Sequence, residues 1–450
     1  MNHRVAAAWL PRLALTALLA GAALPSWPLD LSQAYQAALE QDATIRAARA
    51  GAEARRERLP QARAQLLPNV SANVTRNKND LDQTTLNLFG KPVTSSQHYI
   101  SSIEALTLRQ PIFRKYQFSD YRQAQAQVEE ANATLERDLQ NLGVRVSGAY
   151  FEALLTQEQL ALVLAQKTAY TTQLDAARKR LGAGAGTRTD IDEAQAALDM
   201  NIAQELEARQ SVDFTRRQLQ ALVNQPIDGL AGLDPQRLVL RAPDPDRVED
   251  WTLRAEQNSP EIQSLKAQLE AARQEVEKAK AGHYPTLDAI AQWSRNESDS
   301  VSTVNTRYTN RAIGLQLVVP IFSGGYTSSL VRQAVADQER VEQALEALRS
   351  DLGVRVHREF RGITEGVLRV RALEQAVRSA EQVAVSNRRA YEAGTRTLVD
   401  TLNAEQQRVA ALRDLAQARY LYLMSRVRLQ ALAGGPKSET IDEINGYLRR

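Results

Sequence analysis

The feature that most constrains the fold is a helical pattern that runs without a proline from Phe118 to Leu181. Apolar residues recur along it three, four or seven positions apart, at Val128, Leu135, Leu139, Leu142, Val146 and Tyr150. As one helix these 64 residues would extend for about 96 Å, which is deeper than a single globular core. The helix therefore needs equally long neighbours, as in a coiled coil. Aromatic residues make up only 5% of the chain, in agreement with a thin helical assembly.

The chain repeats itself with an offset of about 210 residues. The landmarks that recur are Pro111-Ile112-Phe113 at 320–322, "LGVRV" (142–146) at 352–356, Ala183-Gly184 at 393–394, and "ALVNQP" (221–226) as "ALAGGP" (431–436). Earlier landmarks, such as Pro68 and Pro285, are 217 residues apart, so the first copy carries a longer insertion before its Pro-Ile-Phe. We therefore divide the chain into a first repeat (24–236), a second repeat (237–436) and a C-terminal tail (437–450).

Each repeat is expected to begin and end with helices. The first helix covers residues 31–66 in the first repeat and 248–281 in the second. A long helical hairpin closes each repeat, over residues 118–222 and 326–432, and its turn lies at the far end from the strands. These helices form an antiparallel coiled coil, an α-barrel once several chains associate.

A β-hairpin is predicted between these helices in each repeat, over residues 67–113 and 285–322. Both segments are rich in Ser, Thr, Val and Ile, alternate roughly between polar and apolar residues, and are bounded by prolines. We expect strands of about ten residues, with polar tips near 78–98 and 297–308. The fold class is thus mainly α with a small β part, built by internal duplication.

The N-terminus is typical of a secretory signal peptide, which we assign to residues 1–23. His3, Arg4 and Arg12 supply positive charge before an apolar run over residues 13–24. The alternative is a membrane anchor, but the run is shorter than the roughly 20 residues that span a bilayer. No later run reaches that length, so we expect a mature chain without a transmembrane helix.

Charge and residue types exclude several classes of function. The net charge is +3, from 56 basic and 53 acidic residues without a basic tract, so we expect no nucleic-acid partner. There is no cysteine, which excludes disulfides and thiolate chemistry. The histidines, at positions 3, 98, 283 and 357, are too far apart to suggest a metal pair. Because catalytic and phosphate-loop motifs are also missing, we predict neither an enzyme nor a cofactor.

Four amphipathic strands in a secreted chain suggest a shared barrel in a membrane. Their edges would leave backbone groups unsatisfied in hydrocarbon unless several copies closed the sheet. Three chains would supply twelve strands, within the range of outer-membrane barrels. The alternative is a secreted periplasmic coiled-coil scaffold without a pore, which leaves the strand-like segments unexplained.

The sequence resembles the TolC family of outer-membrane efflux and secretion channels from about Leu29 to Gly435. The duplication, the strand–Pro-Ile-Phe–helix order and above all "AYEAGTRTLVDTLNAEQ" (390–406) carry the resemblance, since that stretch matches the family's Tyr-x-x-Gly-Thr-Arg-Thr-x-Val-Asp segment. It implies a homotrimer in the cell outer membrane, contacting its lipid, with a periplasmic tunnel of helices. Such a passive duct would serve a tripartite efflux pump or a type I secretion system. The implied partners are a periplasmic adaptor protein and an inner-membrane pump of the RND or ABC type.

The resemblance also implies a periplasmic gate, carried over residue by residue. Tyr391 and Arg396 match the tyrosine and arginine whose links to neighbouring helices hold the tip shut, and Asp190 matches the aspartate that accepts from that arginine. Asp400 matches an aspartate that lines the entrance as a three-fold ring. The second aspartate of the family is Asn403 here, so we expect weaker cation binding at the entrance.

Each of these residues also has a purely structural explanation. Asp190 and Asp400 stand where a first-turn acid favours the helix dipole, and Tyr391 could simply pack between helices. Gly184 and Gly394 stand where a left-handed residue would end a helix, and nearby threonines can cap the next one. As hairpin tips, Gly184, Ala185, Gly394 and Thr395 are the expected adaptor contacts. Drugs, other small molecules and secreted proteins all stay open as substrates.

Overall fold

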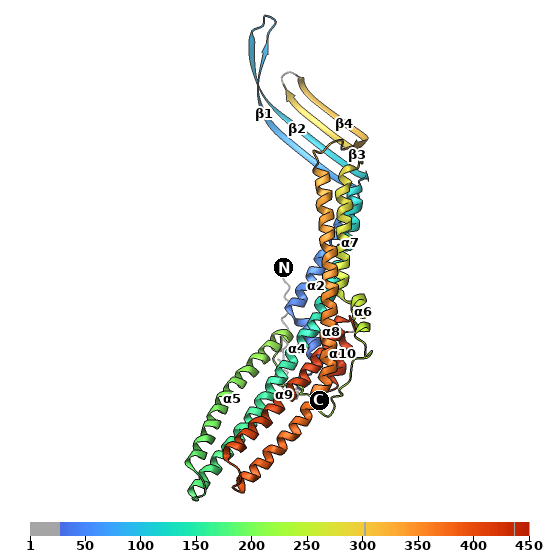
Figure 1. Ribbon diagram of the computed structural model, residues 1–450. Helices are drawn as coiled ribbons and strands as arrows, with labels where there is room; N and C mark the ends of the chain where they lie inside the picture. The colour runs from blue at the N-terminus through green and yellow to red at the C-terminus, as the bar shows by residue number, and fades with distance from the viewer. Residues whose placement is uncertain (1–27, 301–302, 436, 450) are drawn as a thin grey trace, which may run out of the picture.

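The computed structural model describes residues 28–300, 303–435 and 437–449, so the predicted signal peptide (1–23) lies outside the described residues. Figure 1 shows an elongated molecule with a sheet at one end and the turns of long helices at the other. The first and last described residues lie near the middle of its length. Within the described ranges, no helix is long and apolar enough to cross a membrane.

Both halves of the chain run from short helices through two strands to a long helical hairpin, but three short helices precede the strands in the first half and two α-helices in the second, which also ends with an additional helix. The first half holds α1 (Leu31–Gln41), α2 (Ala43–Arg56), α3 (Arg58–Ala64), β1 (Asn69–Leu86), β2 (Pro92–Phe113), α4 (Lys115–Gly182) and α5 (Arg188–Val223). The second half holds α6 (Val248–Asn258), α7 (Pro260–Lys280), β3 (Thr286–Ser300), β4 (Thr303–Val318), α8 (Tyr326–Glu392), α9 (Leu398–Leu432) and α10 (Lys437–Asn445).

The long helical hairpins are present as expected. Helices α4 and α8 have 68 and 67 residues, and each returns through a shorter partner, α5 or α9. Helix α4 also packs against α7 and α9, which joins the two halves side by side. The coiled-coil prediction is therefore confirmed at the level of one chain.

The prediction that each half begins with one continuous helix, over 31–66 and 248–281, is wrong, because each of these segments is broken into shorter helices. The backbone of Asp42 is extended, and its side chain accepts hydrogen bonds from the backbone nitrogens of Thr44 (2.7 Å) and Ile45 (3.0 Å), so α2 begins anew there. In the second half, Ser259 precedes Pro260, which disfavours helical backbone at the serine and starts α7.

The sheet is antiparallel in the order β1-β2-β3-β4, but both of its hairpins are longer than predicted. In the second, β3 and β4 have 15 and 16 residues, and most of the expected polar tip 297–308 is paired strand. Strands β1 and β2 have 18 and 22 residues, so most of the expected polar tip 78–98 is paired strand. Cross-strand pairs between polar side chains, such as Thr84 with Thr94 (2.8 Å), support this extension. Polar residues occupy both faces there, so hydrophobic alternation cannot reveal it.

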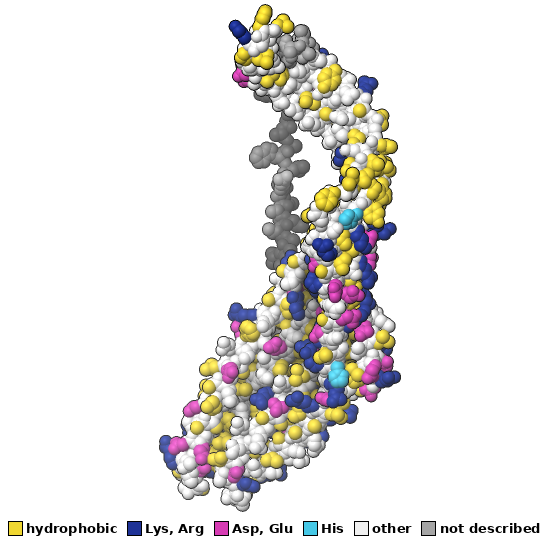
Figure 2. Space-filling model, turned by 45° about the horizontal axis from the view of Figure 1, so that its top comes forward, with side chains coloured by type: hydrophobic (Ala, Val, Ile, Leu, Met, Phe, Trp, Pro, Cys, Tyr) yellow, Lys and Arg dark blue, Asp and Glu magenta, His cyan; other side chains and the backbone are white. Residues whose placement is uncertain are grey.

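Strand register divides the sheet into an apolar and a polar face. Side chains on one face form rows across the strands, such as Val70, Leu108, Ala291 and Ile313. The row beside it on the opposite face is Ser71, Thr107, Gln292 and Ala312. Figure 2 shows hydrophobic side chains gathered where the sheet meets the helices, whereas charged side chains spread over the helical part. This amphipathic sheet suits a wall between lipid and water.

The main core lies in the middle of the molecule. Leu31, Leu142, Leu352, Leu423 and Ile444 are fully buried there. The expected C-terminal tail (437–450) contributes α10, which supplies Ile444 and whose Asn445 accepts a hydrogen bond from the backbone nitrogen of Leu31 at 3.0 Å. Helix α10 is thus packed against α1.

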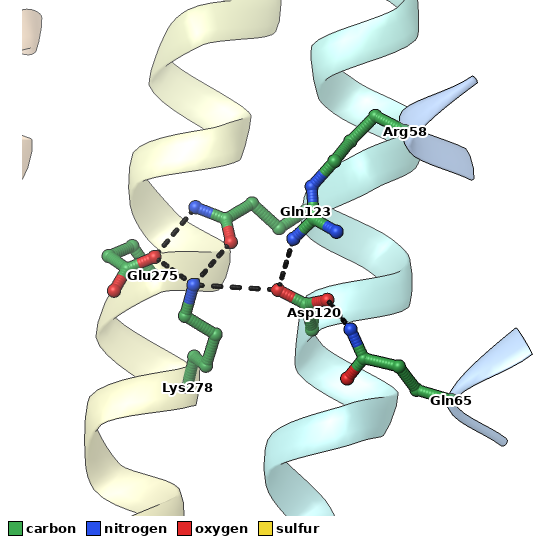
Figure 3. A network of polar contacts seen from close by, with 6 residues as sticks. All are labelled: Arg58, Gln65, Asp120, Gln123, Glu275 and Lys278. Atoms are coloured by element: carbon green, nitrogen blue, oxygen red, sulfur yellow. Dashed lines mark hydrogen bonds and ion pairs between the residues drawn. The ribbon is translucent and has the colours of Figure 1, made fainter. Parts of the chain in front are cut away.

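A polar network ties α3, α4 and α7 together just below the sheet, as Figure 3 shows. At its centre the buried carboxylate of Asp120 accepts a hydrogen bond from Arg58 Nη2 at 2.7 Å, and Lys278 Nζ lies 3.5 Å away. The other members are Gln65, Gln123 and Glu275. The charges compensate one another, which permits a carboxylate to be buried at this junction.

Candidate functional site

The two helical tips have matching turns. Gly184 and Gly394 adopt left-handed backbone conformations, with φ of 75° and 78°, as predicted for residues that end a helix. The backbone nitrogen of the next residue donates back into the helix at 2.9 Å, from Ala185 to Arg180 and from Thr395 to Ala390. Both turns therefore end a long helix abruptly and present exposed backbone at the tip.

Asp190 and Asp400 each form a capping box with the threonine three residues earlier. The Asp190 carboxylate accepts from the backbone nitrogen of Thr187 at 3.0 Å, and the Asp400 carboxylate from that of Thr397 at 3.1 Å. Both aspartates therefore help to cap a helix of their own chain. Hydrogen bonds from the backbone and hydroxyl of Thr397, with the charge of Arg396, lower the pKa of Asp400.

Arg396 pairs with Asp400 within this chain, its Nη1 lying 3.7 Å from the carboxylate. Both side chains are partly exposed, so this is a weak contact. No contact between Arg396 and Asp190 occurs among the described residues, and that link stays a prediction for neighbouring chains. Asn403 is exposed on α9, less than one turn after Asp400.

Tyr391 joins the second helical hairpin to the first through a residue that sequence reasoning missed. The guanidinium of Arg180 stacks on the Tyr391 ring, 4.5 Å from its centroid. The same group donates to the backbone oxygens of Tyr391 (3.1 Å) and Glu392 (3.0 Å) at the end of α8. In the sequence, the only sign of this role is that Arg180 is a basic residue in the last turn of α4. The duplication gives no second sign, because the equivalent residue of the other half is Ala390.

A small apolar cluster lies above the tips and holds the two helical hairpins together. Its buried members are Tyr170, Leu174, Ala177, Ala194, Leu398 and Leu402. The hydroxyl of Tyr391, which packs against this cluster, has no hydrogen-bond partner within the described part of the chain. The tip is thus held by apolar packing and solvent-accessible polar contacts, which can separate without covalent change. Among the described residues, no group of three metal-ligating side chains lies together.

Comparisons with known proteins agree with this architecture. Residues 34–225 and 251–435 match the family described as outer membrane efflux protein. The alkaline protease secretion protein AprF of Pseudomonas aeruginosa is 36% identical over 413 residues, which cover 91% of this chain and 85% of that protein. The outer membrane protein TolC of Vibrio cholerae is 28% identical over 426 residues, 94% of each chain. The crystal structure of VceC from Vibrio cholerae superposes with a TM-score of 0.76 at 19% identity, covering 91% of this chain and 99% of that one.

These likenesses decide between the alternatives raised by the sequence. The relatives are outer-membrane channels, and members of the family are components of tripartite efflux and secretion systems, which suggests adaptor and inner-membrane partners. The chain is therefore a passive outer-membrane exit duct with its helical part in the periplasm, neither an enzyme nor a poreless scaffold. With both halves of the chain matched, it belongs to the outer membrane efflux protein family.

Proposed function

We propose that three copies of this chain form one sealed duct that exports proteins in a type I secretion system. The observation that carries the trimer is the sheet itself: within the described residues β1 and β4 each pair on one side only, while one face is apolar. An open edge in lipid would leave backbone groups without partners. Three copies, with β4 of one beside β1 of the next, give a twelve-stranded barrel with outer-membrane lipid around it.

Exposed apolar side chains on the helices support the same assembly. Helices α5 and α8 flank α4 and α9 in the lower half of the molecule (Figure 1). Met200 and Leu206 of α5 are 63% and 66% exposed, and Val354 and Leu368 of α8 are 69% and 66% exposed. In a ring of three chains, α5 of one copy would lie against α8 of the next and cover these side chains, closing a tunnel of twelve helices.

Contacts between chains at the tips would form the gate. The free hydroxyl of Tyr391 is available to a neighbouring helix, and Arg396 could exchange its partly exposed partner Asp400 for Asp190 of another copy. Three Asp400 carboxylates would then surround the entrance, with Asn403 leaving a second acidic ring absent. Because such contacts are weak singly, an adaptor that binds the turns at Gly184, Ala185, Gly394 and Thr395 could open the tip by competing with them.

The similarity to secretion proteins supports an exported protein as substrate. AprF and the proteases secretion protein PrtF of Dickeya chrysanthemi, which is 30% identical over 412 residues, are both named for the secretion of proteases. We therefore propose an ABC-type inner-membrane pump, rather than an RND drug pump, as the energy source.

Secretion by a reconstituted system tests the proposal. The chain is expressed with the adaptor and ABC pump of a protease secretion system in cells that lack their own duct protein. We expect the protease in the medium and a trimeric mass for the purified duct. If the duct is trimeric but the protease stays in the cells, an exported protein is not the substrate. If the protein extracted from the membrane is monomeric, the proposal of a trimeric duct is wrong.

Single-channel conductance tests the gate separately. Tyr391→Phe combined with Arg396→Ser removes both proposed links between copies, and the conductance in planar bilayers should rise. Arg217→Ser on α5 is a matched control, because its ion pair with Asp213 lies within one helix. Equal conductance of the double variant and the wild type would refute the gate assignment.

A further inference from the structure

Four arginines lie on the apolar face of the sheet, on the side of the apolar rows away from the helices. Register places Arg311 beside Trp293, Arg295 beside Glu104 in the next row, and Arg76 and Arg307 in the row after that. We call Arg76, Arg295, Arg307 and Arg311 the arginine belt. Since the helices lie in the periplasm, the belt stands toward the outer surface of the membrane.

The belt has a net positive charge on one face only. Its rows contain two acidic side chains, Glu104 and Glu297, against the four arginines. Arg307 pairs with Glu297 at 2.5 Å, and Arg76 and Arg295 also interact electrostatically with this carboxylate. At the same height, the opposite face has the uncharged residues Asn73, Thr75, Ile103, Ala105, Ser294, Asn296, Tyr308 and Asn310. If these charges served only solubility, they would be expected on the water-facing side of the sheet as well, not on the lipid-facing side alone.

The belt adjoins the surface that lipid chains would cover. Val70, Leu108 and Ile313 form the apolar row next to Trp293 and Arg311, and Ile313 is 91% exposed. A tryptophan at this height is typical of the boundary between hydrocarbon and headgroups. A lipid whose chains cover the apolar rows therefore brings its headgroup to the belt.

Guanidinium groups bind phosphate through paired hydrogen bonds, which a zwitterionic headgroup offers less well. Within the described residues, Arg76, Arg295 and Arg311 have no ion pair with a carboxylate, so their donors are available. The belt spans three strand spacings and four residues along a strand, roughly 14 Å in each direction. This area accommodates a headgroup with two phosphates.

We propose that the arginine belt binds the phosphates of bisphosphorylated glycolipids of the lipid A type in the outer leaflet. The inference rests on the proposed trimeric barrel, which turns the apolar face toward lipid. It names the lipid that surrounds the duct and the residues that recognise it.

Native mass spectrometry of the purified wild-type duct tests the proposal directly. The duct is titrated with bisphosphorylated lipid A, with its monophosphorylated form and with phosphatidylethanolamine. We expect affinity to fall in that order, and excess inorganic phosphate not to displace the glycolipid. Equal affinity for all three lipids would overturn the proposal, and displacement by inorganic phosphate would show a general anion site instead.

A triple variant locates the site. Arg76→Gln, Arg295→Gln and Arg311→Gln together should weaken lipid A binding by roughly fivefold for each arginine removed, with phosphatidylethanolamine unaffected. Arg109→Gln is the matched control, since register places Arg109 on the polar face of the same sheet. Equal losses in the triple variant and the control would reject the belt. If the wild-type protein is trimeric and conducts ions but shows no lipid preference, only the lipid-binding proposal is refuted. If the purified protein is monomeric, the proposal of a trimeric duct is refuted.

Discussion

Replacing Arg180 by alanine should loosen the contact between the two tips of each chain. Arg180 stacks on Tyr391 and donates two hydrogen bonds to backbone oxygens at the end of α8. The cation–π contact is worth about 0.5–1 kcal/mol at a partly exposed site, and each solvent-accessible hydrogen bond about 0.5 kcal/mol. The total of about 1.5–2 kcal/mol per chain corresponds to roughly a 10- to 30-fold change in the equilibrium between joined and separated tips.

The assay for this prediction is single-channel recording in planar bilayers. We expect Arg180→Ala to give larger or more frequent open currents, with the melting temperature of the duct little changed. Arg178→Ala is the matched control, because Arg178 donates to Gln195 of α5 at 3.2 Å and so acts within the first helical hairpin alone. If both variants conduct like the wild type, Arg180 does not hold the tip, and the reasoning from its contacts fails.

Three further predictions concern stability, measured as thermal unfolding of the purified duct by circular dichroism. Gly362→Ala should lower stability by about 1–3 kcal/mol, because the added carbon would lie 2.5 Å from the hydroxyl and 3.2 Å from the β-carbon of Ser425 in α9. Gly353→Ala should raise stability by about 0.5–1 kcal/mol, because the added carbon would meet only a methyl group of Thr252 at 4.0 Å. Asp120→Ala should lower the free energy of unfolding by about 2 kcal/mol. This is less than the loss expected for a fully buried ion pair, because Lys278 keeps its pair with Glu275 and Arg58 is partly exposed to water. Burial raises the pKa of Glu158 above 4.5 despite its hydrogen bond from Tyr420, so Glu158→Gln should stabilise the duct at neutral pH.

The sign of the Glu158 effect follows from linkage. A carboxyl whose pKa is raised by folding contributes stability below its ordinary pKa of 4.5, and this contribution is lost as the pH rises through the folded value. The advantage of Glu158→Gln should therefore disappear in acid, and a constant advantage at all pH values would contradict the assignment. Equal effects of the two glycine substitutions would contradict the close packing of α8 on α9. An unchanged Asp120→Ala protein would show that the network below the sheet contributes no stability.

The candidate site could be predicted only in part from the sequence. The turns at Gly184 and Gly394 are local features, since a glycine after a long helical pattern and a threonine before the next are readable in order. The contact between Arg180 and Tyr391 is not, because 211 residues separate them and no periodicity relates them. The caps made by Asp190 and Asp400 are local as well, since each aspartate follows its threonine by three residues, whereas the gate roles depend on contacts between chains.

The sequence by itself determined the duplication, the long helices and the existence of two amphipathic hairpins, because helix and strand periods are written into neighbouring residues. Only the tertiary structure decided that Asp42 breaks the first helix, that β1 and β2 extend through residues without hydrophobic alternation, and that four arginines share one face. The break at Asp42 is a local cap, but a continuous helix and a capped restart are both compatible with the same pattern of apolar residues. The extension of β1 and β2 and the shared face of the arginines depend on strand register, which turn geometry must set where the hydrophobic pattern is missing.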